Sequence, residues 1–465
     1  MRRIKLYLLL LFTVSGNTCS QNIDTADGIW SSLPSIIQSI TKPDFPNYQN
    51  SITDFGAKGD GITDCTEAFR KAIDNCADKG GGSVLVPEGI FLTGTIHLRS
   101  NINLHLADNS IIRFLTDPQK YLPVVFTRWE GVECMNYSPL IYAYGQENIA
   151  ITGHGILDGQ GSDSSWWSWK GNKKFGWQEN MPEQNTDRNK LFEMAENNIP
   201  PSERIFGAGH FLRPNFFQPY KCKNVLVEGI TFKNSPMWFL HPVLCKNVSF
   251  INVTVEGPGP NNDGCDPESS GNVLIEGCNF NTGDDCIAIK SGRNNDGRRV
   301  NVPSENIIIR NCKMKDGHGG VVIGSETSGS IRNIFAEDCV MSSPNLDRAI
   351  RIKTNAVRGG IIENVYIRNI TVGEVKEAVV QINFYYEEGE KGSFIPTVRN
   401  VFIRHITSEK SKYAVWIKAF EKSPAENIQI RDCTFNNVAD ENLIENVMDL
   451  KTESVMINNK KWELR

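Results

Sequence analysis

The sequence predicts an all-β protein, a single-stranded parallel β-helix with a helical cap near its N-terminus. Segments that begin with Asn recur along the chain, at starts that lie 23 residues (Asn224 to Asn247) to 36 residues (Asn364 to Asn400) apart. Each copy combines short β-branched runs with Asn, Gly and Asp, which is typical of strands separated by turns. A strand-rich repeat of this length indicates a solenoid in which each copy forms one coil.

Residues 1–20 have the pattern of a secretory signal peptide. A charged start precedes a short apolar run at residues 6–14, and small residues precede Gln21. That run is too short to span a bilayer, and no later segment predicts a membrane span. We therefore expect an exported protein, either periplasmic or secreted. The alternative is an outer-surface lipoprotein anchored at Cys19, although the residues before Cys19 match a lipoprotein signal poorly.

The composition argues against nucleic acid as a partner. The chain has 465 residues, a formal charge of -5 and 22% charged residues, with no long run of Lys or Arg. Nucleic-acid binding usually shows as a basic excess or a basic tract. An anionic ligand would therefore need a local basic site, and the oligomeric state is left open.

Two segments are expected before the repeats begin. Residues 21–50 are rich in Pro, Ser and Asn, and we expect a leader that runs along the surface before a β-helix domain at 51–465. Asp64 and Glu67 resemble a capping box at the start of a helix that should cover the first coil. The apolar face of this helix has helical spacing; its residues are Phe69, Ala72, Ile73 and Cys76.

The cysteines are predicted to be small buried hydrophobes rather than disulfide partners or metal ligands. Four of them occur six residues after the Asn of their repeat, where other copies have Ile230, Val253, Ile370 and Ile406. These four are Cys278, Cys312, Cys339 and Cys433. The same alignment stacks the repeat asparagines, which predicts a ladder of Asn side chains at the turns.

A long insertion at residues 160–205 interrupts the repeats. It contains four tryptophans among many polar residues, namely Trp166, Trp167, Trp169 and Trp177. An aromatic cluster in a long loop can form a wall against a sugar face. The alternative is a loop that packs on its own tryptophans, and the sequence does not distinguish the two.

Alignment of the second strand of each coil brings distant polar residues together. Matching Cys265 to Cys286 places Asp263, Asp284 and His318 in one column on three successive coils, about 4.8 Å apart. Asp285 adjoins this column. Arg351 and Lys353 lie one coil further along, on one face of their strand because side chains alternate.

This group of residues predicts a hydrolase site. One carboxylic acid with a raised pKa can protonate a leaving glycosidic oxygen, as repulsion within the Asp284-Asp285 pair would favour, and another carboxylate can activate water. The two cations can hold a substrate carboxylate. Together they indicate hydrolysis of a polyuronic acid.

The motifs NNDG (261–264), GDDCIAIKSG (283–292), GHGG (317–320) and RIK (351–353) resemble those of glycoside hydrolase family 28, the polygalacturonase family. The resemblance covers residues 50–435 and implies a right-handed, pectin-lyase-like β-helix. The stretch SPMWFLHPVLCKNV (235–248) is similar to the bacterial exo-acting branch in particular. The resemblance therefore implies an inverting hydrolase that releases galacturonate from α-1,4-linked galacturonan in pectin.

The resemblance also implies roles for single residues, with no metal and no organic cofactor. Asp284 would be the general acid, and Asp263 and Asp285 would hold and activate the water. His318 would orient the acid. The carboxylate of the galacturonate would be bound by Arg351, Lys353 and a tyrosine, for which Tyr386 is the match and the adjacent Tyr385 the alternative.

Several alternatives stay open. An exo-α-galacturonidase acting on rhamnogalacturonan-derived oligosaccharides would use the same residues. A pectate lyase or a non-catalytic carbohydrate-binding β-helix would not need the complete set of Asp263, Asp284, Asp285 and His318. The column spacing of about 5 Å is that of retaining enzymes, whereas inverting sites usually have carboxylates about 6.5–9.5 Å apart. On this point the sequence alignment and the family resemblance disagree.

Overall fold

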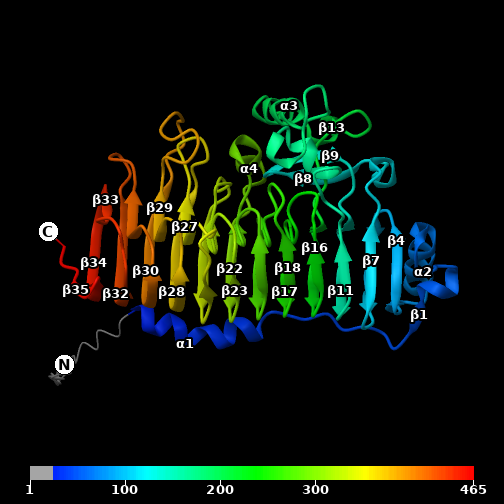
Figure 1. Ribbon diagram of the computed structural model, residues 1–465, viewed down its shortest axis with the longest axis horizontal. Helices are drawn as coiled ribbons and strands as arrows, with labels where there is room; N and C mark the ends of the chain where they lie inside the picture. Colours follow the sequence, from blue (N-terminus) through cyan, green and yellow to red (C-terminus); the bar gives the residue numbers. More distant parts are fainter. Residues whose placement is uncertain (1–24, 465) are drawn as a thin grey trace, which may run out of the picture.

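The computed structural model describes residues 25–464 and shows a right-handed parallel β-helix whose coils lie side by side along the long axis of the molecule (Figure 1). The predicted fold class is confirmed. The proposed signal peptide and Cys19 lie outside the described residues. None of the described helices has the length and apolar run needed to cross a bilayer.

Three columns of parallel strands form the faces of the β-helix. The first column comprises β1 (Gln49–Ser51), β3 (Gly82–Val86), β6 (Ile102–Leu106), β11 (Glu147–Gly153), β15 (Lys223–Glu228), β17 (Lys246–Ile251), β19 (Gly271–Glu276), β22 (Ser304–Arg310), β25 (Ile331–Glu337), β28 (Ile361–Glu374), β30 (Thr397–Lys410), β32 (Ala425–Phe435) and β34 (Val447–Ile457). The second comprises β2 (Asp60–Asp64), β4 (Gly89–Thr93), β7 (Ser110–Phe114), β12 (Ile156–Asp158), β16 (Thr231–Lys233), β18 (Thr254–Gly257), β20 (Asn279–Thr282), β23 (Lys313–Met314) and β26 (Val340–Met341), after which the long strands from β28 onward extend across both columns.

The third column carries the candidate site. Its strands are β5 (Ile96–His97), β10 (Ile141–Tyr144), β14 (Phe217–Tyr220), β21 (Ile287–Ile289), β24 (Val321–Ile323), β27 (Arg348–Lys353), β29 (Ala378–Asn383), β31 (Tyr413–Lys418) and β33 (Leu443–Glu445). Single bridges through Leu240 and Cys265 connect β14 to β21, so the column is continuous. Outside the columns lie the hairpin β8 (Val125–Trp129) and β9 (Val132–Asn136), with β13 (Ile205–Phe206) beside β9, and β35 (Lys460–Lys461), antiparallel to β34.

The predicted Asn ladder is present. The side-chain amide of each repeat Asn from Asn148 to Asn427 donates to the amide oxygen of the Asn one coil earlier, at 2.8–3.2 Å. These asparagines have φ between 51° and 62°, the left-handed region that Asn tolerates better than other non-glycine residues. Asn therefore serves both the turn conformation and the contact between coils.

The interior is apolar, and it includes the cysteines. All eleven cysteines of the described residues are buried and none forms a disulfide there, as predicted for Cys278, Cys312, Cys339 and Cys433. The equivalent positions in other coils, such as Ile230 and Val253, have no exposed surface. Burial of these stacked Cys, Ile and Val side chains stabilises the β-helix from within.

The cap helix is α2 (Thr66–Asp78), which packs at the β1 end of the β-helix (Figure 1). Its predicted apolar face is buried, but the predicted capping box does not form. Cys65 is the N-cap residue, and Asp64 instead accepts a hydrogen bond from the Thr66 backbone at 3.0 Å. The two acids lie one position too early for a reciprocal cap.

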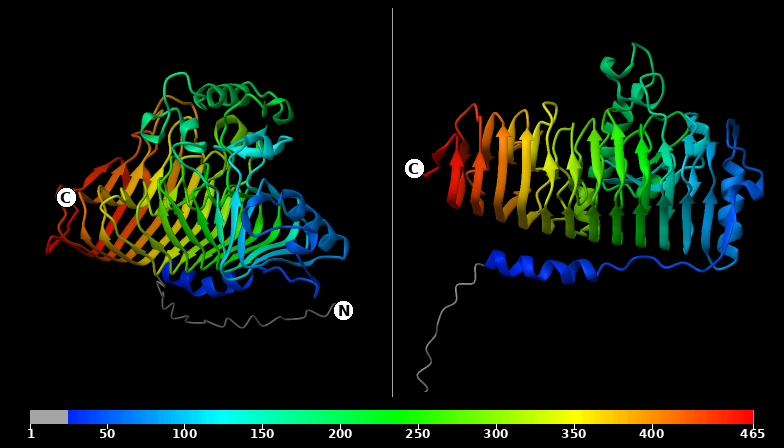
Figure 2. Two further views of the ribbon diagram at one scale, coloured as in Figure 1. Left: turned by 45° about the vertical axis from the view of Figure 1, so that its right-hand side comes forward. Right: turned by 60° about the horizontal axis from the view of Figure 1, so that its bottom comes forward.

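The leader contains a helix that was not predicted, α1 (Thr25–Gln38). This helix lies along the outer face of the first strand column (Figures 1 and 2), where Trp30 and Leu33 pack against Phe335 and its neighbours in adjacent coils. Apolar residues at helical spacing explain the packing. Pro34, inside the helix, and the surrounding polar residues obscured that pattern in the sequence.

The insertion at 160–205 is also more ordered than a loop. It contains the 3-10 turns η3 (Trp166–Lys170), η4 (Lys173–Phe175) and η5 (Pro201–Glu203) and the helix α3 (Asn185–Glu196). Two further 3-10 turns are η1 (Ile52–Phe55) and η2 (Pro118–Tyr121), and α4 (Asn294–Val300) follows β21. In Figure 1 the insertion rises above the central coils, beside α4.

Candidate active site

The site lies on the third strand column, in the turns that precede β21 and β24 and on β27 itself. The register pairs Ile287 with Val321 and Val321 with Ile350, so Asp284 lies beside His318 as predicted. The column is wrong by one residue for Asp263, because Cys265 pairs with Ile287 rather than with Cys286. The alignment matched two cysteines by identity, and identity between neighbouring coils does not determine register.

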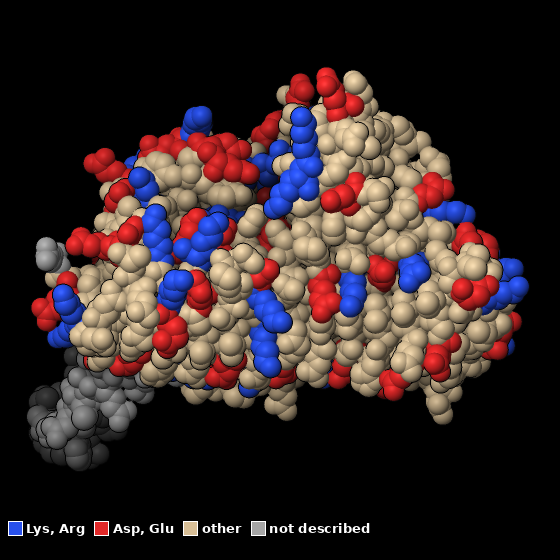
Figure 3. Space-filling view, in the orientation of Figure 1, with Lys and Arg blue, Asp and Glu red and all other residues tan. Residues whose placement is uncertain are grey.

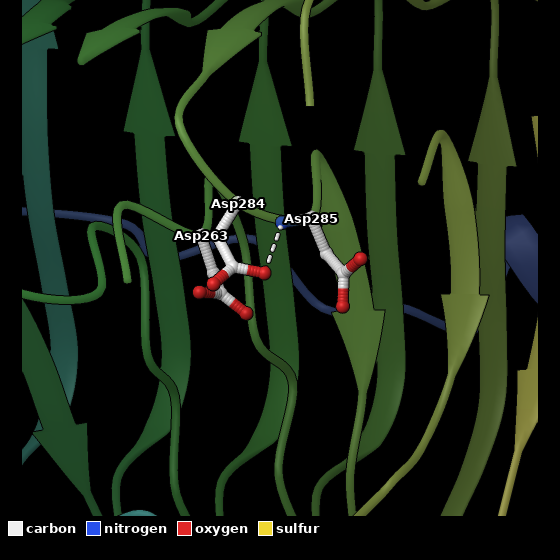
Figure 4. A group of neighbouring side chains, drawn as sticks. All are labelled: Asp263, Asp284 and Asp285. Atoms are coloured by element: carbon white, nitrogen blue, oxygen red, sulfur yellow. Dashed lines mark hydrogen bonds between the residues drawn. The ribbon is translucent and has the colours of Figure 1, made fainter. Parts of the chain in front are cut away.

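The three aspartates nevertheless meet. One oxygen from each of Asp263, Asp284 and Asp285 lies within 4.8 Å of the others. Figure 4 shows the carboxylates of Asp263 and Asp284 side by side, and Asp285 on the far side of Asp284. The backbone amide of Asp285 donates to Asp284 Oδ1 at 3.0 Å, which fixes the orientation of the Asp284 carboxylate.

Asp284 and His318 form an ion pair, with 2.9 Å between Nδ1 and Oδ1. Burial alone would raise the pKa of Asp284, but the hydrogen bond and charge of His318 outweigh it, so this pKa lies below its ordinary value. The same hydrogen bond raises the pKa of His318. The raised pKa that repulsion within the Asp284-Asp285 pair was expected to favour is not found at Asp284, because the closer imidazole dominates.

Asp263 differs from Asp284 in the direction of its pKa shift. Burial and then the charge of Asp284 raise the pKa of Asp263 well above its ordinary value. Its Oδ2 lies 3.6 Å from the ammonium group of Lys290, and its buried Oδ1 has no hydrogen-bond partner among the described residues. Asp266, also buried, has its pKa raised by burial in the same way. Asp263 thus has one oxygen that remains free for a water or a substrate atom.

Arg351, Lys353 and Tyr386 lie together beside Asp285. Lys353 Nζ donates to Asp285 Oδ2 at 2.6 Å, and Arg351 Nη1 lies 3.6 Å from Oδ1. Both cations lie over the Tyr386 ring, at 5.5 Å (Arg351) and 5.1 Å (Lys353). Tyr385 packs on Phe420 instead, so Tyr386 is the tyrosine that the structure brings to the site.

Of the predicted site residues, Asp263, Asp284, Lys353 and Tyr386 line a cavity of about 220 Å³, whereas Asp285, His318 and Arg351 are not part of its lining. Its lining comprises Glu130, Lys170, Arg188, Trp238, Asn261, Asp263, Asp284, Lys290, Arg293, Ser325, Glu326, Lys353, Tyr386 and Glu387. The sequence analysis did not assign a site role to Lys290, Arg293 or Glu326. Lys290 could have been recognised as a cation that directly follows the apolar strand β21, whereas Arg293 and Glu326 had no such signal.

The tryptophans of the insertion do not form a wall of this cavity. Trp166 and Trp167 are buried in the main core, and Trp169 packs edge-on against Trp166. The packing interpretation therefore holds for these three residues. The insertion reaches the cavity with two cations, Lys170 and Arg188, and the aromatic residues that line it are Trp238 and Tyr386. Lys290 Nζ lies 4.5 Å from the centre of the Trp238 ring.

The three aspartates present oxygens at a spacing that could also hold a metal ion. Two ammonium groups already occupy this acidic cluster, because Lys353 contacts Asp285 at 2.6 Å and Lys290 lies 3.6 Å from Asp263. These lysines supply the positive charge that a cation would otherwise bring.

An acid with its own imidazole partner, two further carboxylates and adjoining cations, carried on a right-handed parallel β-helix, defines a glycoside hydrolase of the β-helical class. Comparison with known proteins identifies the family. Residues 209–455 match glycosyl hydrolases family 28, and residues 49–106 match a rhamnogalacturonase A/epimerase, pectate lyase-like pattern. The chain belongs to glycosyl hydrolases family 28.

Individual relatives include exo- and endo-acting enzymes. An exopolygalacturonase of Thermotoga maritima has a solved structure that matches with a TM-score of 0.91 and 48% identity, covering 94% of this chain and 97% of that one. An exo-poly-alpha-D-galacturonosidase of Dickeya chrysanthemi is 26% identical over 90% of this chain and 75% of its own length. An endo-polygalacturonase of Pectobacterium carotovorum subsp. carotovorum is 28% identical over 79% of this chain and 83% of its own length.

Proposed function

We propose that this protein is an exo-acting, inverting polygalacturonase that releases galacturonate from α-1,4-linked galacturonan or its oligosaccharides. The observation that carries this proposal is the cavity beside Asp284. Its volume of about 220 Å³ is below the roughly 300–1,000 Å³ of sites for drug-sized ligands, so it suits one terminal sugar unit rather than a passing chain. The 48% identity to the T. maritima exopolygalacturonase supports the same activity.

We infer that the cavity is closed at both ends along the β-helix axis, because it is lined by loops that precede and follow the acids in the chain. Lys170 and Arg188 of the insertion line one side, and Tyr386 and Glu387 from the loop after β29 line the other. An endo-acting enzyme needs a groove that a polymer can enter along its length. Walls on both sides favour attack at a chain end.

The carboxylates supply the acid and the base. Asp284 lies within 4.8 Å of Asp263, whose pKa is raised, so transfer of one proton from Asp263 to Asp284 would produce a protonated acid and an ionised base together. Asp284 then protonates the leaving glycosidic oxygen, and His318 holds its carboxylate in position. Asp263 and Asp285 accept hydrogen bonds from the water that attacks the anomeric carbon.

The cations next to Asp285 bind the acidic sugar. Arg351 and Lys353 lie between Asp285 and the Tyr386 ring, where a substrate carboxylate can share their charge. Acidic and basic side chains are interspersed over the face shown in Figure 3. Selectivity for an anionic chain therefore depends on these local cations rather than on a field of one sign.

Inversion is proposed despite the short carboxylate spacing. A retaining enzyme needs an ionised carboxylate that is free to attack the anomeric carbon. Asp285 is held by Lys353 and Arg351, and the partner-free Oδ1 of Asp263 is assigned to the attacking water. Proton NMR of freshly released sugar tests this point: β-galacturonate as the first product supports inversion, and α-galacturonate contradicts it.

The product pattern tests exo action. Polygalacturonic acid and defined galacturonate oligosaccharides are incubated with the enzyme, and the products are separated by size over time. Galacturonate alone from the earliest time point is the expected result. A spread of oligomers would show endo action, and an ultraviolet-absorbing unsaturated product would show a lyase. Release from rhamnogalacturonan fragments only would establish the alternative exo-α-galacturonidase.

We also propose that the protein is exported to the periplasm or the medium, on the basis of the charged and apolar pattern of residues 1–20. Fractionation of the producing cells, with N-terminal sequencing of the mature chain, tests this. An N-terminus at Gln21 in the periplasm or medium is expected. An intact N-terminus in the cytoplasm would contradict export, and a lipid on Cys19 would establish the lipoprotein alternative.

A further inference from the structure

Lys170 differs from the other cations that line the cavity. Arg188 contacts Glu130 at 2.7 Å, Arg293 contacts Glu326 at 3.3 Å, Lys290 contacts Glu326 at 3.3 Å, and Lys353 contacts Asp285 at 2.6 Å. Lys170 has no carboxylate within 4.0 Å among residues 25–464. Its ammonium group donates to Asn261 Oδ1 at 2.9 Å.

Behind Lys170 lies a second cation, Arg213, which also has no carboxylate within 4.0 Å among the described residues. Arg213 is fully buried, and its guanidinium donates to Asn261 Oδ1 at 2.8 Å, to two backbone carbonyls and to Gln184. Burial lowers the pKa of Lys170 and of Arg213, because neither charge is fully compensated. Two positive charges therefore converge on one neutral amide oxygen at the cavity wall, and such an arrangement is costly without an anion.

The position of this cation pair relative to the acids is informative. Asn261 lies two residues before Asp263 and therefore on the coil that precedes Asp284, whereas Arg351 and Lys353 lie on coils that follow it. The catalytic carboxylates are thus located between two separate groups of cations. Lys170 and Lys353 both line the cavity and Arg351 lies outside its lining, so the terminal sugar can meet the first group and the next sugar of the substrate the second.

We propose that Lys170, held by Asn261 and supported by the charge of Arg213, binds the carboxylate of the terminal galacturonate, on the opposite side of the cleaved bond from Arg351 and Lys353. This inference rests on the proposed function and adds a specificity to it. The site would recognise the carboxylate of the sugar on each side of the cleaved glycosidic bond. It would therefore favour galacturonate linked to galacturonate over galacturonate linked to neutral rhamnose.

The test pairs two enzymes with two substrates. Digalacturonate and its derivative with a methyl ester on the terminal carboxyl group are hydrolysed by the native protein and by Lys170→Met, which keeps the aliphatic stem. Loss of a charged hydrogen bond should lower kcat/KM for the free acid by about 10- to 100-fold. The ester should lose less than about threefold, because Lys170 has no anion to bind there.

Matched variants serve as controls. Lys173→Met removes an exposed lysine from the same insertion and should change neither rate. Lys170→Arg keeps the positive charge and should recover most of the lost rate, which a merely structural effect of Lys170→Met would not predict. Equal losses on acid and ester, or no loss on either, would overturn the inference.

A binding experiment separates this inference from the proposed function. The same pair of ligands is titrated calorimetrically into Asp284→Asn and into Asp284→Asn with Lys170→Met. A preference of the first protein for the acid that disappears in the second supports the carboxylate site even if hydrolysis is not observed. An unchanged preference overturns it even if the native protein is an active polygalacturonase.

Discussion

At the scale of single residues, the distribution of one proton decides how the site works. Burial would raise the pKa of Asp284, but His318 lowers it below its ordinary value, whereas burial raises the pKa of Asp263 well above its ordinary value. Adjacent carboxylates in a sequence show that a proton will be shared, but they do not show which residue holds it. Which aspartate has the raised pKa depends on the distance from Asp284 to His318 and on the distance from Asp263 to Lys290, and each distance joins two different coils.

Asp284→Asn should lower kcat by about 100- to 10,000-fold while binding of oligogalacturonate changes little, because the amide cannot protonate the leaving oxygen. Steady-state kinetics and calorimetric binding measure the two effects. Asp108→Asn is the control, since Asp108 also pairs with a histidine, His154 at 3.0 Å, but on the exposed surface. Activity of Asp284→Asn close to that of the native protein would exclude Asp284 as the acid.

The raised pKa of His318, caused first by its hydrogen bond to Asp284, determines the alkaline side of the pH profile. His318 stays protonated above the ordinary histidine range, and kcat/KM should fall as the pH rises through this raised pKa. In His318→Gln that alkaline decline should disappear, and kcat/KM at lower pH should drop by about 100-fold. The measurement is kcat/KM against pH for the two proteins, with His154→Gln as a control that keeps the native profile. The same alkaline decline in His318→Gln would contradict this role.

At the scale of elements, the Asn ladder connects the turns of successive coils. Asn306 donates to Asn272 and accepts from Asn333, both at 3.1 Å, in a backbone conformation with φ of 55°. Two separate costs follow from its removal, one for the lost hydrogen bonds and one for an alanine at positive φ.

Asn306→Ala should lower the free energy of unfolding by about 2–4 kcal/mol, of which about 1 kcal/mol is backbone strain. The exposed Asn180 has φ of 68° and lies outside the ladder, so Asn180→Ala isolates the strain. Denaturant unfolding of both variants measures the difference. Equal losses would mean that the ladder contributes nothing beyond its turn conformation.

At the scale of the whole molecule, the reactivity of the thiols shows whether the coils stay closed around the core. The eleven cysteines of the described residues are all buried and unpaired, from Cys65 in the cap to Cys433 in a late coil. Buried thiols in apolar surroundings are inert toward thiol reagents.

The folded chain that begins at Gln21 should therefore show no reactive thiol, and the denatured chain should show eleven, without any reductant. Thiol titration before and after denaturation is the measurement. Fewer than eleven thiols after denaturation would reveal disulfides, and rapid labelling of the folded protein would show that the coils open.

Much of this architecture could be predicted because the sequence repeats with a short period. The repeat asparagines, the inward Cys278 and Ile230 and the apolar face of α2 depend only on neighbours at fixed spacing, so the pattern alone indicates them. The presence of Asp263, Asp284, Asp285 and His318 in one site also followed, because parallel coils bring equivalent positions together.

What the sequence determined by itself was the solenoid, the location of the acids and the family to which their motifs point. Only the tertiary structure decided the register of Asp263, which aspartate has the raised pKa, the helix in the leader and the part of the insertion that reaches the cavity. Lys170 illustrates the physical reason. Whether a cation is paired depends on every carboxylate within a few ångströms, and those come from segments whose packing no local pattern specifies.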